Sequence, residues 1–264
     1  MDKTTILGLI LGFIAIGVGM VMKGVSPEAL LNPAAFLIIF VGTAASVLIA
    51  FPMSTIKKIP KLFKIIFTEE QKYDLNEMIQ MFSQWADLAR REGILALETR
   101  IDEIDDQFLA TGLELSIDGQ SPDFIRDVLM EKVDAMEERH QQGAMVFSQA
   151  GTYAPTLGVL GAVVGLVAAL SNLEDVEALG HAISAAFIAT LFGIFSGYVL
   201  WHPFANKLRE KSKAEVLMKN IMIEGILSIA NGESPLVIKE KLSSYLSASD
   251  LAKLKGFEEE GENA

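Results

Sequence analysis

Four long stretches without a charged residue constrain this chain more than any other feature. They are Thr4–Met22, Ala29–Ile56, Gln141–Leu173 and Ala178–Asn206. A helix needs about 20 apolar residues to cross a bilayer, and uncharged stretches of this length are rare in soluble domains. We therefore predict an all-α integral membrane protein with four transmembrane helices. The third and fourth stretches are longer than the bilayer requires, so both helices are expected to extend beyond it.

Each stretch also has a less specific interpretation. Lys3 precedes the first apolar run, as in a cleaved signal peptide, but no A-x-A-type cleavage site follows and the run is long for such a peptide. The other three stretches could be buried core helices of a soluble protein, although their length argues against this.

Basic residues are concentrated at one side of the predicted helices. They follow the second and fourth stretches, at positions 57, 58, 61 and 64 and at positions 207, 209, 211 and 213, whereas the connections 23–32 and 172–177 carry one lysine between them. By the positive-inside rule, both termini lie in the cytoplasm, as do the extensions of the third and fourth helices. The predicted parts are transmembrane helices one and two (1–56), a cytoplasmic acidic helical domain (57–140), transmembrane helices three and four (141–206), and cytoplasmic C-terminal helices with an acidic tail (207–264).

The net charge of −12 belongs to one segment of the chain. Between Glu69 and His140 there are nineteen acidic and seven basic residues, which accounts for the whole imbalance. Such a segment would repel phosphates, so no nucleic-acid partner is expected, and a basic protein surface suits it better. The chain has no cysteine and only three widely separated histidines, so we expect no metal site, no cofactor and no soluble-enzyme chemistry.

The cytoplasmic segments have the periodicity of amphipathic helices. Apolar residues recur at three- and four-residue steps in Asn76–Leu97, although Gly93 leaves open whether that helix ends there. Ser121 and Pro122 are typical of an N-cap and a first helical residue, and no breaker separates that helix from the third membrane stretch. Lys207–Ala230 is predicted to form a further amphipathic helix, and the tail Phe257–Ala264 to be disordered.

The predicted spans hold no carboxylate and no lysine, the groups that usually form ion sites and proton relays inside a bilayer. Only His181 and His202 could titrate there, and interfacial histidines are commonplace. The chain alone therefore lacks the chemistry of an ion path.

Small residues recur at helical spacing in the last two spans. In the third they are Pro155, Gly158, Ala162, Gly165 and Ala169, and in the fourth Ala186, Thr190, Gly193 and Gly197. Two interpretations remain open: ordinary helix packing within the subunit, or a smooth surface against which another helix fits. If that helix brought an aspartate, the Thr190 hydroxyl would be within its reach. Pro155 frees a backbone carbonyl one turn earlier and is a possible hinge.

Several sequence runs together resemble the flagellar stator A-subunit family, which includes MotA and its sodium-driven relative PomA. They are 90–98 (RREGILALE), 151–158 (GTYAPTLG), 161–166 (GAVVGL), 189–193 (ATLFG) and 202–208 (HPFANKL). The resemblance extends over essentially the whole chain. Without it, Arg90 and Glu98 would be interpreted as a solvated surface.

The resemblance implies partners as well as residue roles. Members of the family form a homopentamer around two B-type (MotB-like) subunits, each with a membrane aspartate and a wall-binding domain, in the bacterial cytoplasmic membrane. Pro155 and Pro203 correspond to family prolines at the third-helix kink and at the inner end of the fourth helix, and Thr190 to a threonine on the ion path. Arg90 and Glu98 correspond to charged residues that engage the rotor protein FliG.

The residue at position 162 bears on the choice of ion. Sodium-driven members usually carry threonine where this chain has Ala162, and an extra hydroxyl would help to bind a dehydrated sodium ion. The resemblance therefore implies a proton-driven stator subunit of the flagellar motor. Two alternatives are a TolQ/ExbB-like energiser of an envelope protein and a membrane scaffold that conducts no ions.

Overall fold

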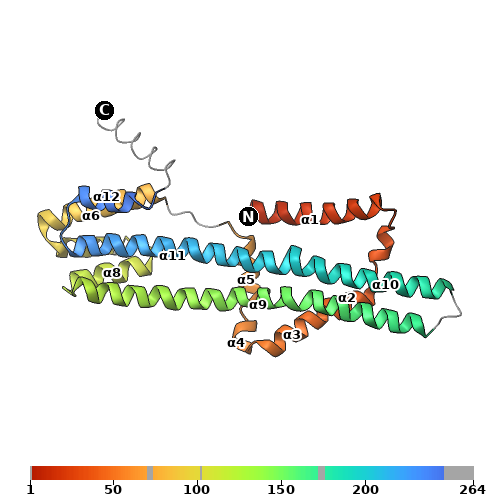
Figure 1. The fold of residues 1–264 in the computed structure, drawn as a ribbon. Helices are drawn as coiled ribbons and strands as arrows, with labels where there is room; N and C mark the ends of the chain where they lie inside the picture. The colour runs from red at the N-terminus through yellow and green to blue at the C-terminus, as the bar shows by residue number, and fades with distance from the viewer. Residues whose placement is uncertain (1, 70–73, 102, 172–175, 247–264) are drawn as a thin grey trace. The chain divides into compact units, whose positions relative to one another are not determined.

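The computed structural model describes residues 2–69, 74–101, 103–171 and 176–246, and every regular element within them is helical (Figure 1). Contacts divide the chain into two compact units. We call residues 1–70 and 139–212 the apolar unit, and residues 71–138 and 213–264 the acidic unit. The tail predicted to be disordered and most of the connection 172–177 lie outside the described residues.

Four helical segments are long and apolar enough to cross a membrane, which confirms the predicted fold class. They are α1 (Lys3–Met22), Pro33–Ala50, α9 (Pro122–Leu170) and Val176–Ala230. The last segment joins α10 (Val176–Phe195), the π-helical turn η4 (Ser196–Trp201) and α11 (His202–Ala230). The extensions of the third and fourth spans are thus confirmed as continuous helix.

The second span is shorter than the uncharged stretch that predicted it. The Asn32 side chain accepts a hydrogen bond from Ala35 N (3.0 Å), and Pro33 occupies the first helical position, so the helix begins there. It ends at Ala50, because Phe51 precedes Pro52 and is extended. The span consists of α2 (Pro33–Phe36), the π-helical turn η2 (Leu37–Val41) and α3 (Gly42–Ala50).

Short helices precede and follow the second span within the apolar unit. They are η1 (Pro27–Leu30), α4 (Met53–Ile56) and α5 (Ile59–Phe67). The apolar side of α5 packs on α9 and α11, where the Phe63 ring lies 5.0 Å from the Phe147 ring and 6.0 Å from the Phe204 ring. The opposite side of α5 exposes Lys61 and Lys64.

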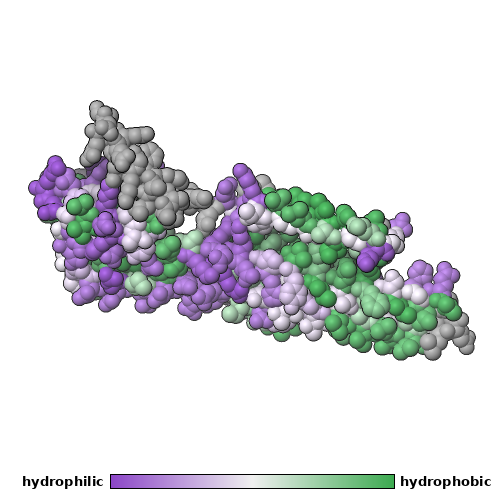
Figure 2. Space-filling view, turned by 45° about the horizontal axis from the view of Figure 1, so that its top comes forward, coloured by the Kyte–Doolittle hydropathy of each residue, from purple (hydrophilic) through white to green (hydrophobic). Residues whose placement is uncertain are grey.

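The apolar unit leaves much hydrophobic surface uncovered. No residue of α1 is buried, and Leu7, Phe13 and Val21 are all more than half exposed. Figure 2 shows hydrophobic residues over α1 and over the paired α9 and α10. Exposed patches of this size are typical of surfaces covered by lipid or by other chains.

The acidic unit has a core of its own. Its helices are α6 (Leu75–Glu92), η3 (Ile94–Leu97), α7 (Glu98–Ile101), α8 (Gln107–Ile117), α12 (Pro235–Ser243) and parts of α9 and α11. Phe82, Leu113 and Ile226 are fully buried in this core. The Phe82 ring lies directly on Gly225, where an added Cβ would come within 2.6 Å of it.

Local signals in the sequence set the ends of these helices. Gly93 has φ 90°, which favours glycine, and α6 ends just before it, so the predicted helix 76–97 is interrupted there. The Ser121 hydroxyl accepts a hydrogen bond from Phe124 N (3.3 Å) at the start of α9, as predicted. Gly232, with φ 69°, follows α11, and Ser234 caps α12.

Candidate functional site

The small residues of α9 and α10 bring the two helix backbones into direct contact. A Cβ placed on Gly158 would lie 2.9 Å from both the Gly193 Cα and the Ala189 carbonyl oxygen. A Cβ on Gly193 would lie 2.7 Å from the Ala154 carbonyl oxygen. For these residues the interpretation as packing within the subunit is correct, because the face they form is occupied by the neighbouring helix.

Pro155 lies where this contact meets the π-helical turn. Proline has no N–H, so the Gly151 carbonyl four residues earlier lacks its usual intrahelical donor. That carbonyl oxygen and the Pro155 ring both lie against Gly197, since an added Cβ there would be 2.9 Å from the oxygen and 2.7 Å from Cγ. α9 continues through the proline, and the irregular backbone of the fourth span is placed directly opposite it. A π-helical turn opposite a proline is a local departure from regular packing of the kind often found at functional sites.

Ala162 and Thr190 flank the backbone contact and are both half-buried. Ala162 follows Gly158 by about one turn, and Thr190 precedes Gly193 by about one turn. The Thr190 hydroxyl donates to the Ala186 carbonyl oxygen over 3.4 Å, a long bond that leaves both oxygen lone pairs available. The hydroxyl is therefore free to accept a further hydrogen bond from a group brought to this face.

Pro203 lies apart from Pro155, on the side of α11 that faces α1. It is exposed and lines a cavity of about 390 Å³, together with Thr4, Gly8 and Lys207. His202, beside it, packs its ring on Gly151, where an added Cβ would come within 2.8 Å. The His202 side chain is half-buried against α9, and its predicted place at the membrane interface stays a prediction.

An ionic cluster that the sequence did not indicate lies beside the cavity and shares Thr4 and Lys207 with its lining. The Asp2 carboxylate accepts hydrogen bonds from Lys207 (2.6 Å) and from the Thr4 hydroxyl (2.7 Å). The backbone N–H of Asp2 donates to the Phe67 carbonyl oxygen (2.9 Å). Lys211 lies 3.8 Å from the same carboxylate and donates to the Ile65 carbonyl oxygen (2.8 Å). Burial raises the pKa of Asp2, but Lys207 and the threonines outweigh it and hold the pKa well below its ordinary value. The cluster fastens α1, α5 and α11 to one another.

Arg90 and Glu98 both belong to the acidic unit, and both side chains are exposed. Arg90 lies in the last turn of α6 and Glu98 begins α7, with the turn at Gly93 between them. Their neighbours are paired, because Arg91 binds Asp87 (2.8 Å) and Arg100 binds Glu103 (3.0 Å). Among the described residues neither Arg90 nor Glu98 has an ion-pair partner, so both charges are available to another molecule.

Sequence models of two families match the chain. The N-terminal family of motility protein A matches residues 6–93, and the MotA/TolQ/ExbB proton channel family matches residues 100–221. Motility protein A of Bacillus subtilis (strain 168) is 60% identical over 99% of this chain and 96% of its own length. The chemotaxis protein PomA of Vibrio alginolyticus is 36% identical over 93% of this chain and 96% of its own length.

Two solved structures share the fold. The structure of the flagellar MotAB stator complex from Bacillus subtilis has a TM-score of 0.90 and 60% identity, with 95% of this chain and 99% of that chain covered. The structure of MotAB from C. jejuni has a TM-score of 0.89 and 33% identity, with 94% and 97% covered. The chain therefore belongs to the MotA/TolQ/ExbB proton channel family and, within it, to the motility protein A stator subunits of the bacterial flagellar motor.

Proposed function

We propose that the chain, with a B-type subunit, forms a proton-conducting channel that converts ion flow into torque on the flagellar rotor. The observation that carries the proposal is the combination of a stator A-subunit sequence with four predicted membrane stretches, 4–22, 29–56, 141–173 and 178–206, that contain no carboxylate and no lysine. Such a subunit needs a partner that supplies the titratable group. The two solved relatives are MotAB complexes, and the resemblance implies that the B-type subunit supplies this group. This role is mechanical and conductive, and it involves no enzymatic reaction.

The B-type subunit contributes a membrane helix with an aspartate and a domain that anchors it to the cell wall. Five copies of this chain surround a pair of B-type helices, as the resemblance implies. The uncovered surfaces support an assembly of this kind, because apolar side chains such as Phe187 on α10 and Val163 on α9 are more than half exposed. Lipid and neighbouring copies would cover these faces.

The ion path runs along the helices that meet at Gly158 and Gly193. Thr190 offers its hydroxyl oxygen to the partner's carboxyl group, and Ala162 leaves the path without the second hydroxyl that would favour a dehydrated sodium ion. Pro155 acts as the hinge of α9. The Gly151 carbonyl, which Pro155 leaves without a donor, can accept a different hydrogen bond when the helix bends. Pro203 marks the inner end of the path, beside the Asp2 cluster.

Rotor contact is assigned to Arg90 and Glu98, which would engage the rotor protein FliG. Two exposed charges of opposite sign, without ion-pair partners in the described part of the chain, suit a surface that meets matched charges on a moving partner. The proposal puts the acidic unit and both termini in the cytoplasm, and the positive-inside distribution of lysines supports this orientation. The predicted segments 57–140 and 207–264 are then the cytoplasmic parts of a multi-pass protein of the cytoplasmic membrane.

Proton flux into liposomes tests the proposed channel. The chain reconstituted alone should conduct no protons, because its spans hold no relay, and adding the B-type subunit should create a flux. Changing the partner's membrane aspartate to asparagine should abolish that flux at equal protein content. A proton leak through the chain alone would contradict the proposal.

A further inference from the structure

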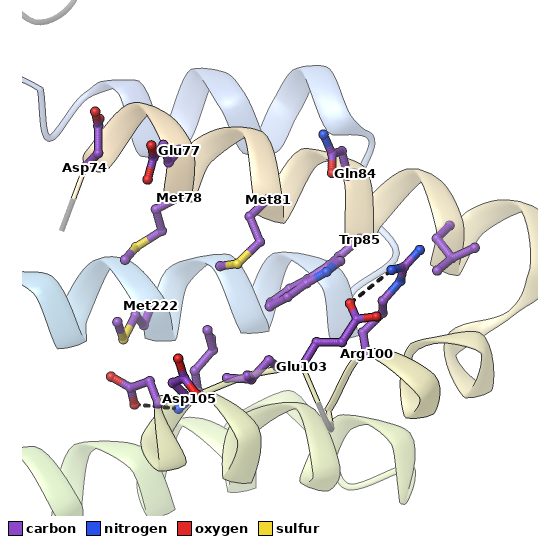
Figure 3. Close-up of a pocket in the computed structure, with 14 residues that line it drawn as sticks. Asp74, Glu77, Met78, Met81, Gln84, Trp85, Arg100, Glu103, Asp105 and Met222 are labelled. Atoms are coloured by element: carbon purple, nitrogen blue, oxygen red, sulfur yellow. Dashed lines mark hydrogen bonds and ion pairs between the residues drawn. The ribbon is translucent and has the colours of Figure 1, made fainter.

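The acidic unit contains a groove of about 930 Å³ between α6, the segment from α7 to α8, and α11 (Figure 3). One face of α6 lines it from end to end, through Met78, Met81, Trp85 and Leu88 at three- and four-residue steps. Met222 of α11 lies opposite the two α6 methionines, whose side chains project from the helix toward it in Figure 3. The floor of the groove is therefore apolar, and flexible methionines provide much of it.

The rim of the groove carries uncompensated negative charge. Five carboxylates line it, but Glu103 is paired with Arg100 (3.0 Å) and Asp106 with Lys219 (2.6 Å). That leaves Asp74, Glu77 and Asp105, all exposed. Among the described residues no lysine or arginine forms an ion pair with any of these three. A ligand that fits both surfaces must be apolar on one side and basic along its edges.

The dimensions favour a helix. From Asp74 to Leu88 the lining face of α6 extends roughly 20 Å at 1.5 Å per residue, enough for a partner helix of about four turns. The cavity is too long for one side chain, and its apolar residues recur at the spacing that a helix-in-groove contact uses. A second copy of this chain would bring the same acidic surface, so like-charge repulsion disfavours it as the occupant.

We propose that this groove binds a basic amphipathic helix of another protein, with the apolar side of that helix on Met78, Met81 and Trp85 and its basic side chains at Glu77 and Asp105. The site is separate from the proposed rotor contact, because neither Arg90 nor Glu98 lines it. It gives the subunit a second protein-binding surface, whose partner is defined by charge and amphipathicity. The inference does not depend on ion conduction or on the rotor assignment.

Trp85 provides a direct readout of occupancy. The chain has two tryptophans, and the other is Trp201 in the apolar unit. In a Trp201→Phe background the full chain, held in nanodiscs of zwitterionic lipid, emits from Trp85 alone. The probe is a 14-residue peptide of two Leu-Lys-Lys-Leu-Leu-Lys-Leu repeats. We expect a saturable blue shift of Trp85 emission, whereas peptide adsorbed on lipid would leave Trp85 unchanged.

Two variant pairs separate the groove from general attraction to the acidic unit. Glu77→Lys with Asp105→Lys should weaken peptide binding about tenfold, because it reverses the charges at the rim. The matched control, Glu92→Lys with Asp118→Lys, makes the same change in net charge at exposed residues outside the groove and should alter binding less than about twofold. A peptide of identical composition without helical periodicity should bind at least about tenfold more weakly.

Four results would overturn the proposal. The first is a Trp85 spectrum that the peptide leaves unchanged. The second is failure of either specificity test, that is, equal weakening of peptide binding by the two variant pairs or equal binding of the aperiodic peptide. The third is a Trp85 response that appears only in a chain ending at Leu246, which would make the chain's own C-terminal segment the occupant. The fourth is a Trp85 fluorescence that acrylamide quenches only after the copies of the chain have been separated. That result would make a second copy of the chain the occupant of the groove.

Discussion

The backbone of Gly158 in α9 touches the backbone of Gly193 in α10, with an added Cβ at Gly158 placed 2.9 Å from the Gly193 Cα. The three atoms nearest to that Cβ all belong to the backbone, which cannot move aside as a flexible side chain can. Gly158→Ala should therefore separate the two helices and destabilise the folded protein by about 1–3 kcal/mol. Thermal unfolding of the purified protein measures this loss.

Gly17→Ala is the matched control for the helix contact. Gly17 also lies inside a membrane helix, but nothing lies within 4 Å of an added Cβ there. Alanine is the better helix former, so this variant should be as stable as the parent or slightly more stable. Equal unfolding temperatures for Gly158→Ala and Gly17→Ala would show that the helices can separate at no cost.

Pro155→Ala should affect motility more than stability. The alanine N–H restores a hydrogen bond to the Gly151 carbonyl, and loss of the ring vacates the space against Gly197, so α9 becomes more regular. We expect an unchanged or higher unfolding temperature together with reduced swimming at equal membrane abundance. Pro122→Ala is the control, because proline at the first helical position needs no N–H, and it should swim normally. Normal swimming by Pro155→Ala would remove the hinge role.

Asp2→Asn should destabilise the apolar unit in a pH-dependent way. The folded-state pKa of Asp2 lies below its unfolded value, so its contribution to stability is fully present above the unfolded pKa of about 3.9 and is lost as the pH falls through the folded value. The parent should unfold at a higher temperature than the variant by a constant margin from pH 8 to about pH 5. The margin should narrow only in stronger acid, and the loss at neutral pH should be about 1–2 kcal/mol.

The control for this titration is Asp127→Asn, an exposed carboxylate on α9. Its replacement should leave the stability curve within about 0.5 kcal/mol of the parent. If Asp2→Asn follows the same curve as Asp127→Asn, the cluster of Asp2, Lys207 and Lys211 contributes nothing to stability.

Exchange of the charges at Arg90 and Glu98 tests the rotor contact. Arg90→Glu with Glu98→Lys should stall swimming while membrane insertion stays normal, because attraction is replaced by repulsion. Single alanine variants should reduce swimming only partly, since each exposed pair contributes about 0.2–1 kcal/mol. A matching charge exchange on the rotor protein should restore part of the motility.

Glu131→Lys with Lys132→Glu provides the charge-neutral control for this exchange. Both side chains are exposed on α9, away from the turn at Gly93. This pair should swim like the parent. If the double reversal at Arg90 and Glu98 also swims like the parent, these two residues are solvated surface only.

Much of the fold could be predicted because its determinants are local. Absence of charge over a whole helix length predicts a membrane span without reference to the rest of the chain. The ends of helices at Gly93, Ser121 and Gly232 likewise depend on one or two residues each. The shortened second span was missed, although Pro52 within the uncharged stretch was the signal that could have predicted it.

Contacts between distant residues could not be predicted in the same way. Asp2 meets Lys207, and Asp106 meets Lys219, across separations at which sequence pattern carries no information about pairing. The π-helical turn opposite Pro155 depends on how two helices fit, and the groove beside Trp85 depends on three segments. For the small-residue stripe the sequence left two interpretations open, and the structure distinguishes them only at Gly158, Gly193 and their neighbours. The roles of Pro155, Ala162, Thr190, Pro203, Arg90 and Glu98 stay predictions.

Rotation of tethered cells tests the central claim most directly. The strain should lack its own stators and carry this chain with its B-type subunit, both at normal membrane abundance. Because Ala162 leaves no second hydroxyl on the path, the rotation rate should follow the proton-motive force and stay constant when external sodium is varied at fixed proton-motive force. Cells that remain stationary, or that rotate at a rate set by sodium, would contradict the assignment of this chain as a proton-driven stator subunit.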